Sequence, residues 1–521
     1  MLRSQQTREG FFLLSCAILL ICCSFAQGRQ THSRTEVEPY VLTAPGQAND
    51  LAWGYNLELQ GDTLIVAAAD IASDEDEPDR GQIWKLIYSD DEWQYHNVLE
   101  SPAAEGARFG YSLALADSIM IVGASEDENP DGLRTGAAYI YYRDEDGWEL
   151  RHRFQPDLLS EGARFGHSVA ADSGRVLVSA VEQPGLNDLD RAGAVFGYDL
   201  IRNPEKEPVR TNLNVSLPSE RERLGWALDM HGKWAVVTTK EGGLAIGPRN
   251  RAFVFEQSTI NTGWTARETF HRNQSNWVHF GSSAAISEHT VFVGHPREQY
   301  QDSENGVAYF YEGFNTDAPF DEGGFIPPSA PQSFSNHARD LSTHGDQVIV
   351  LGTFVVDQLR RTGDAPDGYS WEFAKSFSSD GGETRRFADA VDINDRFMVA
   401  SGYDGPDQTT ADRVIYWYQA SKPTQAEHKQ ENRPTRVRLD DAYPNPFNAE
   451  TILPFSLQKQ THARIEVFDL SGRKIAVLLD ETLSPGEHTV RFDAGDLASG
   501  VYIYRLTADG LVFSRKMTLI K

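Results

Sequence analysis

One phrase returns along the first four-fifths of the chain at a nearly constant interval. It reads RFGYSLALADSIMIVGAS from Arg108 and RFGHSVAADSGRVLVSA from Arg164. Its glycines are separated by 56, 56, 59 and 56 residues: Gly54, Gly110, Gly166, Gly225 and Gly281. A repeat of this length indicates units that bury their hydrophobic faces only by stacking on copies of themselves.

Each period contains four short strand patterns. In the second copy they cover residues 109–116, 118–125, 136–143 and 148–154. The second pattern is a dense run of β-branched and apolar residues, whereas the last two alternate apolar with polar residues. Four-stranded antiparallel units at this spacing are typical of β-propeller blades, so the sequence predicts an all-β fold.

We count seven copies, which begin near residues 52, 108, 164, 223, 279, 337 and 386. The last two are degraded, with Arg339 and Ala388 where the glycine is expected. The seventh copy lacks a fourth strand, and a strand-like segment at residues 38–45 precedes the first copy. We therefore predict a seven-bladed propeller over residues 37–419, in which the N-terminal strand completes blade seven and removes an exposed edge.

The N-terminus has the pattern of a secretory signal peptide at residues 1–26. Arg3 and Arg8 precede an apolar run that ends at Ala26, after which we expect cleavage. The three cysteines (Cys16, Cys22 and Cys23) all lie in this leader, so we expect no disulfide in the mature chain. No other segment is apolar and long enough to span a bilayer, so no integral membrane segment is expected in the mature chain.

The formal net charge of the chain is −28. A surface this acidic repels nucleic acid and anionic lipid headgroups, so neither is expected as a partner.

The last part of the chain differs in kind. Residues 420–438 are polar, contain proline and lack periodicity, as linkers do. Residues 439–521 contain period-two stretches broken by glycine-containing turns, which predicts a small immunoglobulin-like β-sandwich.

Two families are recognisable in these motifs. Phe109-Gly110 and Ile121-Val122-Gly123-Ala124 resemble FG-GAP repeats, the integrin-α-like type of propeller. The tail resembles the type A C-terminal sorting domain of the type IX secretion system. Its motifs occur in the family's order and include Tyr443, Pro444, Asn445, Pro446, Phe447, Asn448, Gly472, Gly500 and Lys516.

The tail's resemblance implies a route out of the cell. It implies a Bacteroidetes-like, Gram-negative bacterium in which the leader directs inner-membrane export and the tail directs passage across the outer membrane. The implied partners are the type IX secretion machinery and a surface sortase that removes the tail. The product is then secreted or attached to the outer surface of the outer membrane.

The integrin-like resemblance also implies calcium, but this sequence departs from that pattern. The family places Asp-x-Asp-x-Asp-Gly loops between the first two strands, where this chain has only tight turns. Asp127, Asn129 and Asp131 fit the start of a calcium loop, but Ala138 stands where a bidentate glutamate is needed. A solvated acidic turn is favoured over a metal site, and no cofactor is expected.

No catalytic motif such as HExxH, GxSxG or a P-loop occurs, so no catalytic residue is assigned and an enzyme is not expected. The residues that follow the recurring glycine could still form a ligand site at one mouth of the axial channel. They are Tyr55, Tyr111, His167, Trp226, Ser282, Asp340 and Asp389. Aromatic rings could stack on a sugar and two carboxylates could hydrolyse a glycoside, but packing between blades is favoured.

Three functions remain open at this stage. The first is a non-enzymatic, secreted or surface-displayed propeller for adhesion or binding, with an unknown extracellular protein or carbohydrate ligand. The second is a secreted hydrolase or lyase that acts on polysaccharide at the axial mouth. The third is a structural component of the cell surface.

Overall fold

The computed structural model divides the chain into two compact units, Met1–Ala420 and Ser421–Lys521. It describes residues 39–45, 52–69, 81–116, 118–143, 147–172, 174–185, 189–200, 209–214, 221–240, 250–257, 263–271, 279–288, 290–300, 303–313, 321–329, 336–362, 370–378, 385–404, 412–419, 438–439, 442, 445, 447–457, 460–469, 473–484, 486–495, 497–508 and 511–520. The predicted signal peptide with its cleavage site at Ala26, and residues 420–437 of the predicted linker, lie outside the described residues.

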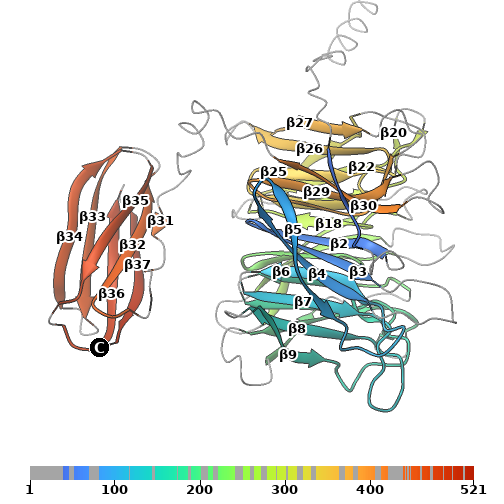
Figure 1. Cartoon of the computed structure of the whole chain (residues 1–521), viewed down its shortest axis with the longest axis horizontal. Coiled ribbons are helices and arrows are strands. Elements are labelled where there is room, and N and C mark those ends of the chain that lie inside the picture. The colour runs from blue at the N-terminus through green and yellow to red at the C-terminus, as the bar shows by residue number, and fades with distance from the viewer. Residues whose placement is uncertain are drawn as a thin grey trace, which may run out of the picture. The chain divides into compact units, whose positions relative to one another are not determined.

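All the secondary-structure elements in the described part of the chain are β-strands (Figure 1). In the first unit, antiparallel pairing groups the strands into seven sets of four, which we call blades 1 to 7. Blades 3 and 4 are also joined by a short parallel contact between their outer strands, β13 and β17. The predicted all-β propeller class is confirmed.

The blades follow one another along the chain. Blade 1 contains β2 (Ala52–Gln60), β3 (Thr63–Ala69), β4 (Gln82–Ser89) and β5 (Glu92–Glu100); blade 2 contains β6 (Phe109–Ala116), β7 (Ile119–Ala124), β8 (Ala137–Arg143) and β9 (Trp148–Phe154). Blade 3 contains β10 (Phe165–Asp172), β11 (Arg175–Ala180), β12 (Ala194–Asp199) and β13 (Val209–Asn214); blade 4 contains β14 (Leu228–His231), β15 (Trp234–Thr238), β16 (Arg251–Gln257) and β17 (Trp264–His271).

The remaining blades continue this order. Blade 5 contains β18 (Ala284–Ile286), β19 (Thr290–His295), β22 (Val307–Glu312) and β23 (Asp321–Ile326), with a small hairpin of β20 (Gln299–Tyr300) and β21 (Ser303–Glu304). Blade 6 contains β24 (Asp340–His344), β25 (Gln347–Leu351), β26 (Val355–Thr362) and β27 (Ser370–Ser378). Blade 7 contains β28 (Arg385–Ile393), β29 (Phe397–Asp404), β30 (Asp412–Gln419) and β1 (Tyr40–Thr43).

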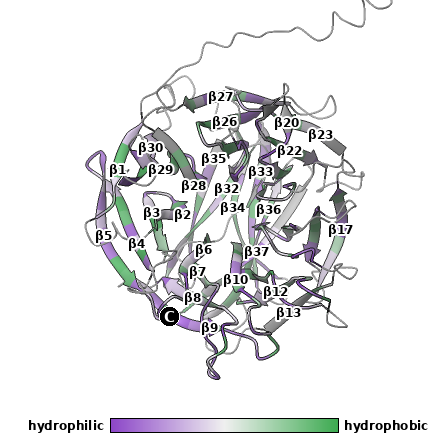
Figure 2. Ribbon diagram, turned by 90° about the vertical axis from the view of Figure 1, so that its right-hand side faces the viewer, coloured by the Kyte–Doolittle hydropathy of each residue, from purple (hydrophilic) through white to green (hydrophobic). Residues whose placement is uncertain are grey.

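The first strand of each blade lies next to the first strand of the following blade. These inner strands are β2, β6, β10, β14, β18, β24 and β28, and β28 in turn contacts β2. The blades therefore form a closed ring around an axis (Figure 2).

The second strand of each blade is buried because both faces of the sheet are covered. In β7 the residues alternate between two hydrophobic clusters: Ile119 and Ile121 pack toward blade 3, whereas Met120 and Val122 pack toward blade 1. A strand buried on both faces is apolar at every position, which explains the unbroken run in the repeat.

Blade 7 contains both ends of the first unit. β1 pairs antiparallel with β30, with Tyr40 opposite Trp417 and Thr43 opposite Val414. The rings of Tyr40 and Trp417 stack with their centroids 4.4 Å apart. The N-terminal strand thus supplies the outermost strand of the sheet whose other strands come from residues 385–419.

The recurring glycine is needed because neighbouring inner strands approach closely. Gly166 has a φ of +85°, and a Cβ there would lie 2.3 Å from the carbonyl oxygen of Ala137. In blade 6 this position is Ala338, not Arg339 as predicted. Ala338 has a φ of +65°, and its carbonyl accepts a hydrogen bond from Ser283, as the carbonyl of Gly166 does from Ser112. Asp340 therefore follows the glycine position by two residues, not one.

The second unit is a sandwich of two antiparallel sheets. One contains β31 (Arg438–Leu439), β32 (Glu450–Leu457) and β35 (Gly486–Asp493). The other contains β33 (Thr461–Asp469), β34 (Lys474–Leu483), β36 (Gly500–Ala508) and β37 (Leu511–Leu519). Buried residues of both sheets, such as Phe455 and Tyr504, form one core.

Part of the predicted sorting motif lies beside the end of the chain. The amide of Phe447 donates to the carbonyl of Thr518 and the carbonyl of Phe447 accepts from the amide of Ile520, each at 2.9 Å. The side-chain oxygen of Asn445 accepts from the amide of Thr518. Lys516 is exposed on β37 and Gly500 begins β36, while Tyr443, Pro444, Pro446 and Gly472 lie outside the described residues. The first and last motifs of the tail thus form one contact.

Within the described residues, the structure contains no helix that could cross a membrane.

We predict that a chain beginning at residue 46 is less stable than one beginning at residue 39, because β30 loses its pairing partner and Trp417 loses its stacked ring. Burial of Leu42 against the same core adds to the loss, which we expect to reach about 2 kcal/mol or to produce oligomers through the open edge. Thermal unfolding and size-exclusion chromatography measure both effects. Equal melting temperatures and monomeric elution of both chains would contradict the structural role of β1.

Candidate functional site in the axial channel

A cavity of about 360 Å³ runs along the axis between the inner strands. Of the seven predicted ligand residues, Tyr111, His167, Trp226 and Asp340 line this channel. Asp389 lines an adjoining cavity of about 590 Å³, and Ser282 lines both. Tyr55 lines neither cavity but packs against Tyr111. The structure thus gathers the predicted residues around one end of the inner strands.

Four rings form a continuous arc across blades 1 to 4. The ring centroids are 5.4 Å apart from Tyr55 to Tyr111, 5.2 Å from Tyr111 to His167, and 4.7 Å from His167 to Trp226. Each contact joins one blade to the next, so these side chains pack between blades. Tyr111, His167 and Trp226 also line the channel.

The environment of His167 keeps its imidazole neutral. Burial lowers its pKa to about 3, and the positive charges of Arg164 and Lys240 act in the same direction. A group with so low a pKa does not accept a proton near neutral pH, so His167 is poorly suited to general-base catalysis.

The arginines before the recurring glycine are held by glutamates on the loop after the second strand. Glu126 lies 3.8 Å from Arg108 and 3.2 Å from Arg164, and so joins blades 2 and 3. Glu182 lies 2.9 Å from Arg223 of blade 4. These repeated ion pairs indicate that the arginines serve packing between blades.

Carboxylates deeper in the channel bind the backbone of the following blade. Asp229 accepts from the amide of Ile286 at 2.8 Å, and Asp392 accepts from the amide of Leu59 at 2.5 Å. Asp340 accepts from the amide of Val391 at 3.0 Å. Inner strands are sheet edges with free amide groups, and these side chains satisfy them. We call such side-chain-to-backbone contacts blade latches.

The latching carboxyls have raised pKa values. Burial raises the pKa of Asp229 and of Asp340 to about 7, partly offset by their backbone hydrogen bonds. Burial, offset by hydrogen bonds from Ser342 and Leu59, leaves the pKa of Asp392 at about 6. The pKa of Glu58 lies well above its usual range because of burial and the charge of Asp392. These groups are partly open to the channel but remote from bulk solvent.

Asp389 is already bound by two guanidinium groups. Arg413 lies 2.7 Å from one carboxylate oxygen and Arg339 lies 3.7 Å from the other. Arg413 also donates to the carbonyl of Trp53, so this cluster joins blade 7 to blade 1.

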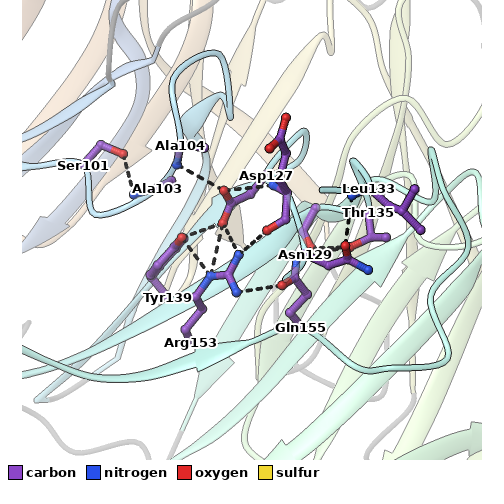
Figure 3. Close-up of polar contacts among 12 residues, drawn as sticks. Ser101, Ala103, Ala104, Asp127, Asn129, Leu133, Thr135, Tyr139, Arg153 and Gln155 are labelled. Atoms are coloured by element: carbon purple, nitrogen blue, oxygen red, sulfur yellow. Dashed lines mark hydrogen bonds and ion pairs between the residues drawn. The ribbon is translucent and has the colours of Figure 1, made fainter. Parts of the chain in front are cut away.

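The candidate calcium loop is a hydrogen-bonded turn (Figure 3). Asp127 is 1% exposed, accepts from Tyr139 and forms an ion pair with Arg153 at 2.8 Å. The side-chain oxygen of Asn129 accepts from the amides of Asp131 and Leu133. The oxygens needed for a cation are therefore engaged by the protein itself. In the described residues no cluster of three His, Cys, Asp or Glu side chains is suited to a metal ion.

Sequence reasoning missed Glu58, Asp229 and Asp392. All three follow the glycine position by four residues, in blades 1, 4 and 7. This shared offset was the available signal, since alternate residues of an inner strand face the same side.

Comparison with known proteins identifies parts of both units. Residues 97–141 match the family model described as the FG-GAP repeat, and residues 441–521 match the secretion system C-terminal sorting domain. The chain carries an FG-GAP repeat and a type IX secretion sorting domain. The sorting domain indicates export through this system to the cell surface or the extracellular space. No curated protein matches the chain.

Several solved structures are similar at low identity. PorZ, a surface component of the type IX secretion system of Porphyromonas gingivalis, is 13% identical with a TM-score of 0.44; the match covers 93% of this chain and 61% of PorZ. A fungal alcohol oxidase of the AA5 family with copper is 10% identical with a TM-score of 0.42, over 92% of this chain and 99% of the oxidase. The β-propeller domain of the Trilobed protease from Pyrococcus furiosus is 7% identical with a TM-score of 0.37, over 74% and 98%. The chain spans less than two thirds of the length of PorZ.

We predict that Asp229→Asn makes stability less sensitive to pH. The folded pKa of about 7 exceeds the unfolded value of 3.8, so the folded state keeps a proton that the unfolded state has released. Stability from this proton is complete below about pH 4 and is lost as the pH rises through 7. From pH 4 to pH 8, the free energy of unfolding of the variant should therefore rise by about 1 kcal/mol or more relative to that of the wild-type protein.

Urea unfolding at both pH values measures this difference, with Asp131→Asn at an exposed turn as the matched control. Because His167 is present in both proteins, its opposite loss of stability on acidification cancels in the comparison. A difference that does not change with pH would show that Asp229 titrates normally.

Proposed function

We propose that the protein is a non-enzymatic binding propeller, secreted or held at the cell surface, whose mouth recognises an extracellular ligand. The observation that carries this proposal is the use of the channel's acidic groups as blade latches. Asp229, Asp340 and Asp392 each accept a backbone amide of the next blade. Their hydrogen bonds hold the ring together and leave no free carboxylate pair for acid–base chemistry among them.

The position of Asp340 and Asp389 weighs against the hydrolase alternative. A glycosidase needs one carboxyl group as the acid and an accessible carboxylate as the base or nucleophile. Asp389 is held between Arg339 and Arg413, and Asp340 accepts the amide of Val391. In each of these two carboxyl groups at least one oxygen is held by a contact between blades.

The aromatic arc favours binding. The side chains of Tyr111 and Trp226 are only half-buried and line the channel. Aromatic faces held rigidly by their neighbours bury area on a ligand at a small cost in entropy. A mouth built in this way fits recognition better than turnover.

The binding function predicts retention without turnover. Purified protein incubated with a panel of polysaccharides and glycosides should bind at least one of them and release no product, and Trp226→Ala should reduce binding while keeping the melting temperature within a few degrees. Affinity gel electrophoresis measures binding and chromatography of the supernatants measures product. Product that disappears in Asp340→Asn would instead establish the hydrolase.

The sorting domain predicts a second outcome in cells. Deletion of residues 441–521 should leave the propeller folded but keep it in the periplasm, because the outer-membrane signal is lost. Fractionation of the native host followed by immunoblotting compares the truncated chain with the full-length one. Glu481→Ala, at an exposed side chain of β34, is the matched control and should be exported normally. Appearance of the truncated chain in the medium at full-length levels would contradict the sorting role.

A further inference from the structure

One position recurs at the channel mouth, on the loop that follows the second strand of a blade. It is identified by a backbone hydrogen bond to the residue three before the glycine position. The amides of Glu126, Glu182 and Lys240 donate to the carbonyls of Ala107, Ala163 and Glu222, respectively. We call this the rim position, and it is occupied by glutamate in blades 2 and 3 but by lysine in blade 4.

Arg297 occupies the rim position of blade 5. It follows Gly294 by three residues, as Glu126 follows Gly123. The two glycines are equivalent, because a Cβ on Gly123 would meet Ser112 and the carbonyl of Gly166, and a Cβ on Gly294 would meet Ser283 and the carbonyl of Ala338. The charge at the rim therefore reverses between blade 3 and blade 4.

This reversal leaves positive charge that no carboxylate among the described residues pairs with. Glu126 and Glu182 neutralise the arginines beside them. Among the residues that the structure describes, neither Lys240 nor Arg297 forms an ion pair. A chain with a net charge of −28 thus carries a local cationic region at its mouth.

The two cations line the cavity of about 590 Å³ beside the channel. Its other lining residues are mostly polar: His279, Ser282, Pro296, Asn336, Arg339, Thr353, Asp389 and Tyr403. Three cationic side chains thus face one carboxylate, and that carboxylate is bound by Arg413 from outside the lining. The cavity has an excess of positive charge and many hydrogen-bonding groups.

Lys240 is held in place at the border between this cavity and the channel. Its Nζ lies 4.1 Å from the centroid of the Trp226 ring. Burial and the charges of Arg223 and Arg297 lower its pKa to about 8. A cation in these surroundings is stabilised by an anion that enters the cavity.

We propose that the cavity binds an acidic sugar unit of an extracellular polysaccharide, with its anionic group among Lys240, Arg297 and Arg339. The sugar ring then lies toward the aromatic surfaces of Tyr403, which lines the cavity, and of Trp226, which lines the adjoining channel. This inference rests on the proposed binding function and specifies the class of ligand. A carboxylate and a sulfate share the required charge and acceptor oxygens, so both are candidate anionic groups.

Calorimetric titration of the purified protein with three soluble polymers tests the ligand class. We expect polygalacturonate, which carries carboxylates, or dextran sulfate to bind, whereas neutral dextran should not. Lys240→Glu, which restores the residue type of blades 2 and 3, should weaken binding about tenfold or more. Lys240→Gln should have a smaller effect in the same direction.

Arg151→Glu is the matched control because it makes the same charge change on β9, the outer strand of blade 2, at an exposed side chain. It should change the affinity by no more than about twofold, since exposed charges contribute little. If Lys240→Glu and Arg151→Glu weakened polysaccharide binding equally, the attraction would be a general one for polyanions and the proposed site would be wrong. Binding of polyglutamate as tightly as the polysaccharides would also overturn the site. Binding of dextran that Trp226→Ala reduces and Lys240→Glu does not would overturn the acidic class while leaving the binding function intact.

Discussion

The ring depends on hydrogen bonds that cross from a side chain of one blade to the backbone of the next. Every inner strand is the edge of its own sheet, so its outward amides and carbonyls have no partner within the blade. Among the described residues, each of the seven junctions contains at least one such latch. The side chains that supply them are Asn56, Ser112, Ser168, Asp229, Ser283, Asp340 and Asp392. Asp392 closes the ring by binding Leu59, 333 residues away.

This use of polar groups limits what the channel can do. The latching carboxyl groups are buried and have raised pKa values, as catalytic acids often do. Their hydrogen bonds, however, join neighbouring blades of the ring. The raised pKa values of Asp229 and Asp340 arise from their burial at the sheet edges that these side chains close. At the rim, lysine and arginine stand in blades 4 and 5 at the position that glutamate occupies in blades 2 and 3.

The sequence predicts the blade pattern because the burial of each strand leaves a mark that repeats once per blade. A strand covered on both faces is apolar throughout, and inner strands that approach closely require glycine. The apolar run and the recurring glycine can therefore be recognised in the sequence alone. In blade 6 the spacing of the glycines predicts Arg339 at this position, but Ala338 occupies it and adopts the left-handed conformation. The latches were not predicted because the sequence does not show which inner-strand side chains face the next blade. Their shared offsets are nevertheless visible in the sequence. Five of the latches follow the glycine position by two residues, and Asp229 and Asp392 follow it by four.

Blade 6 also shows how a repeat can diverge without losing its packing. Four blades place a phenylalanine edge-on to an aromatic ring of the third strand: Phe109 with Tyr139, Phe165 with Phe196, Phe280 with Tyr309 and Phe387 with Tyr416. In blade 6 these two positions are His337 and Asp357, fully buried with Nε2 and Oδ2 3.1 Å apart. Asp357 also accepts hydrogen bonds from the amide and the hydroxyl of Ser329. His337 without Asp357 would bury Nε2 without a partner, which destabilises a fold. In blade 6 a hydrogen-bonded pair of polar side chains thus replaces the aromatic pair, so this copy departs from the repeat at both positions.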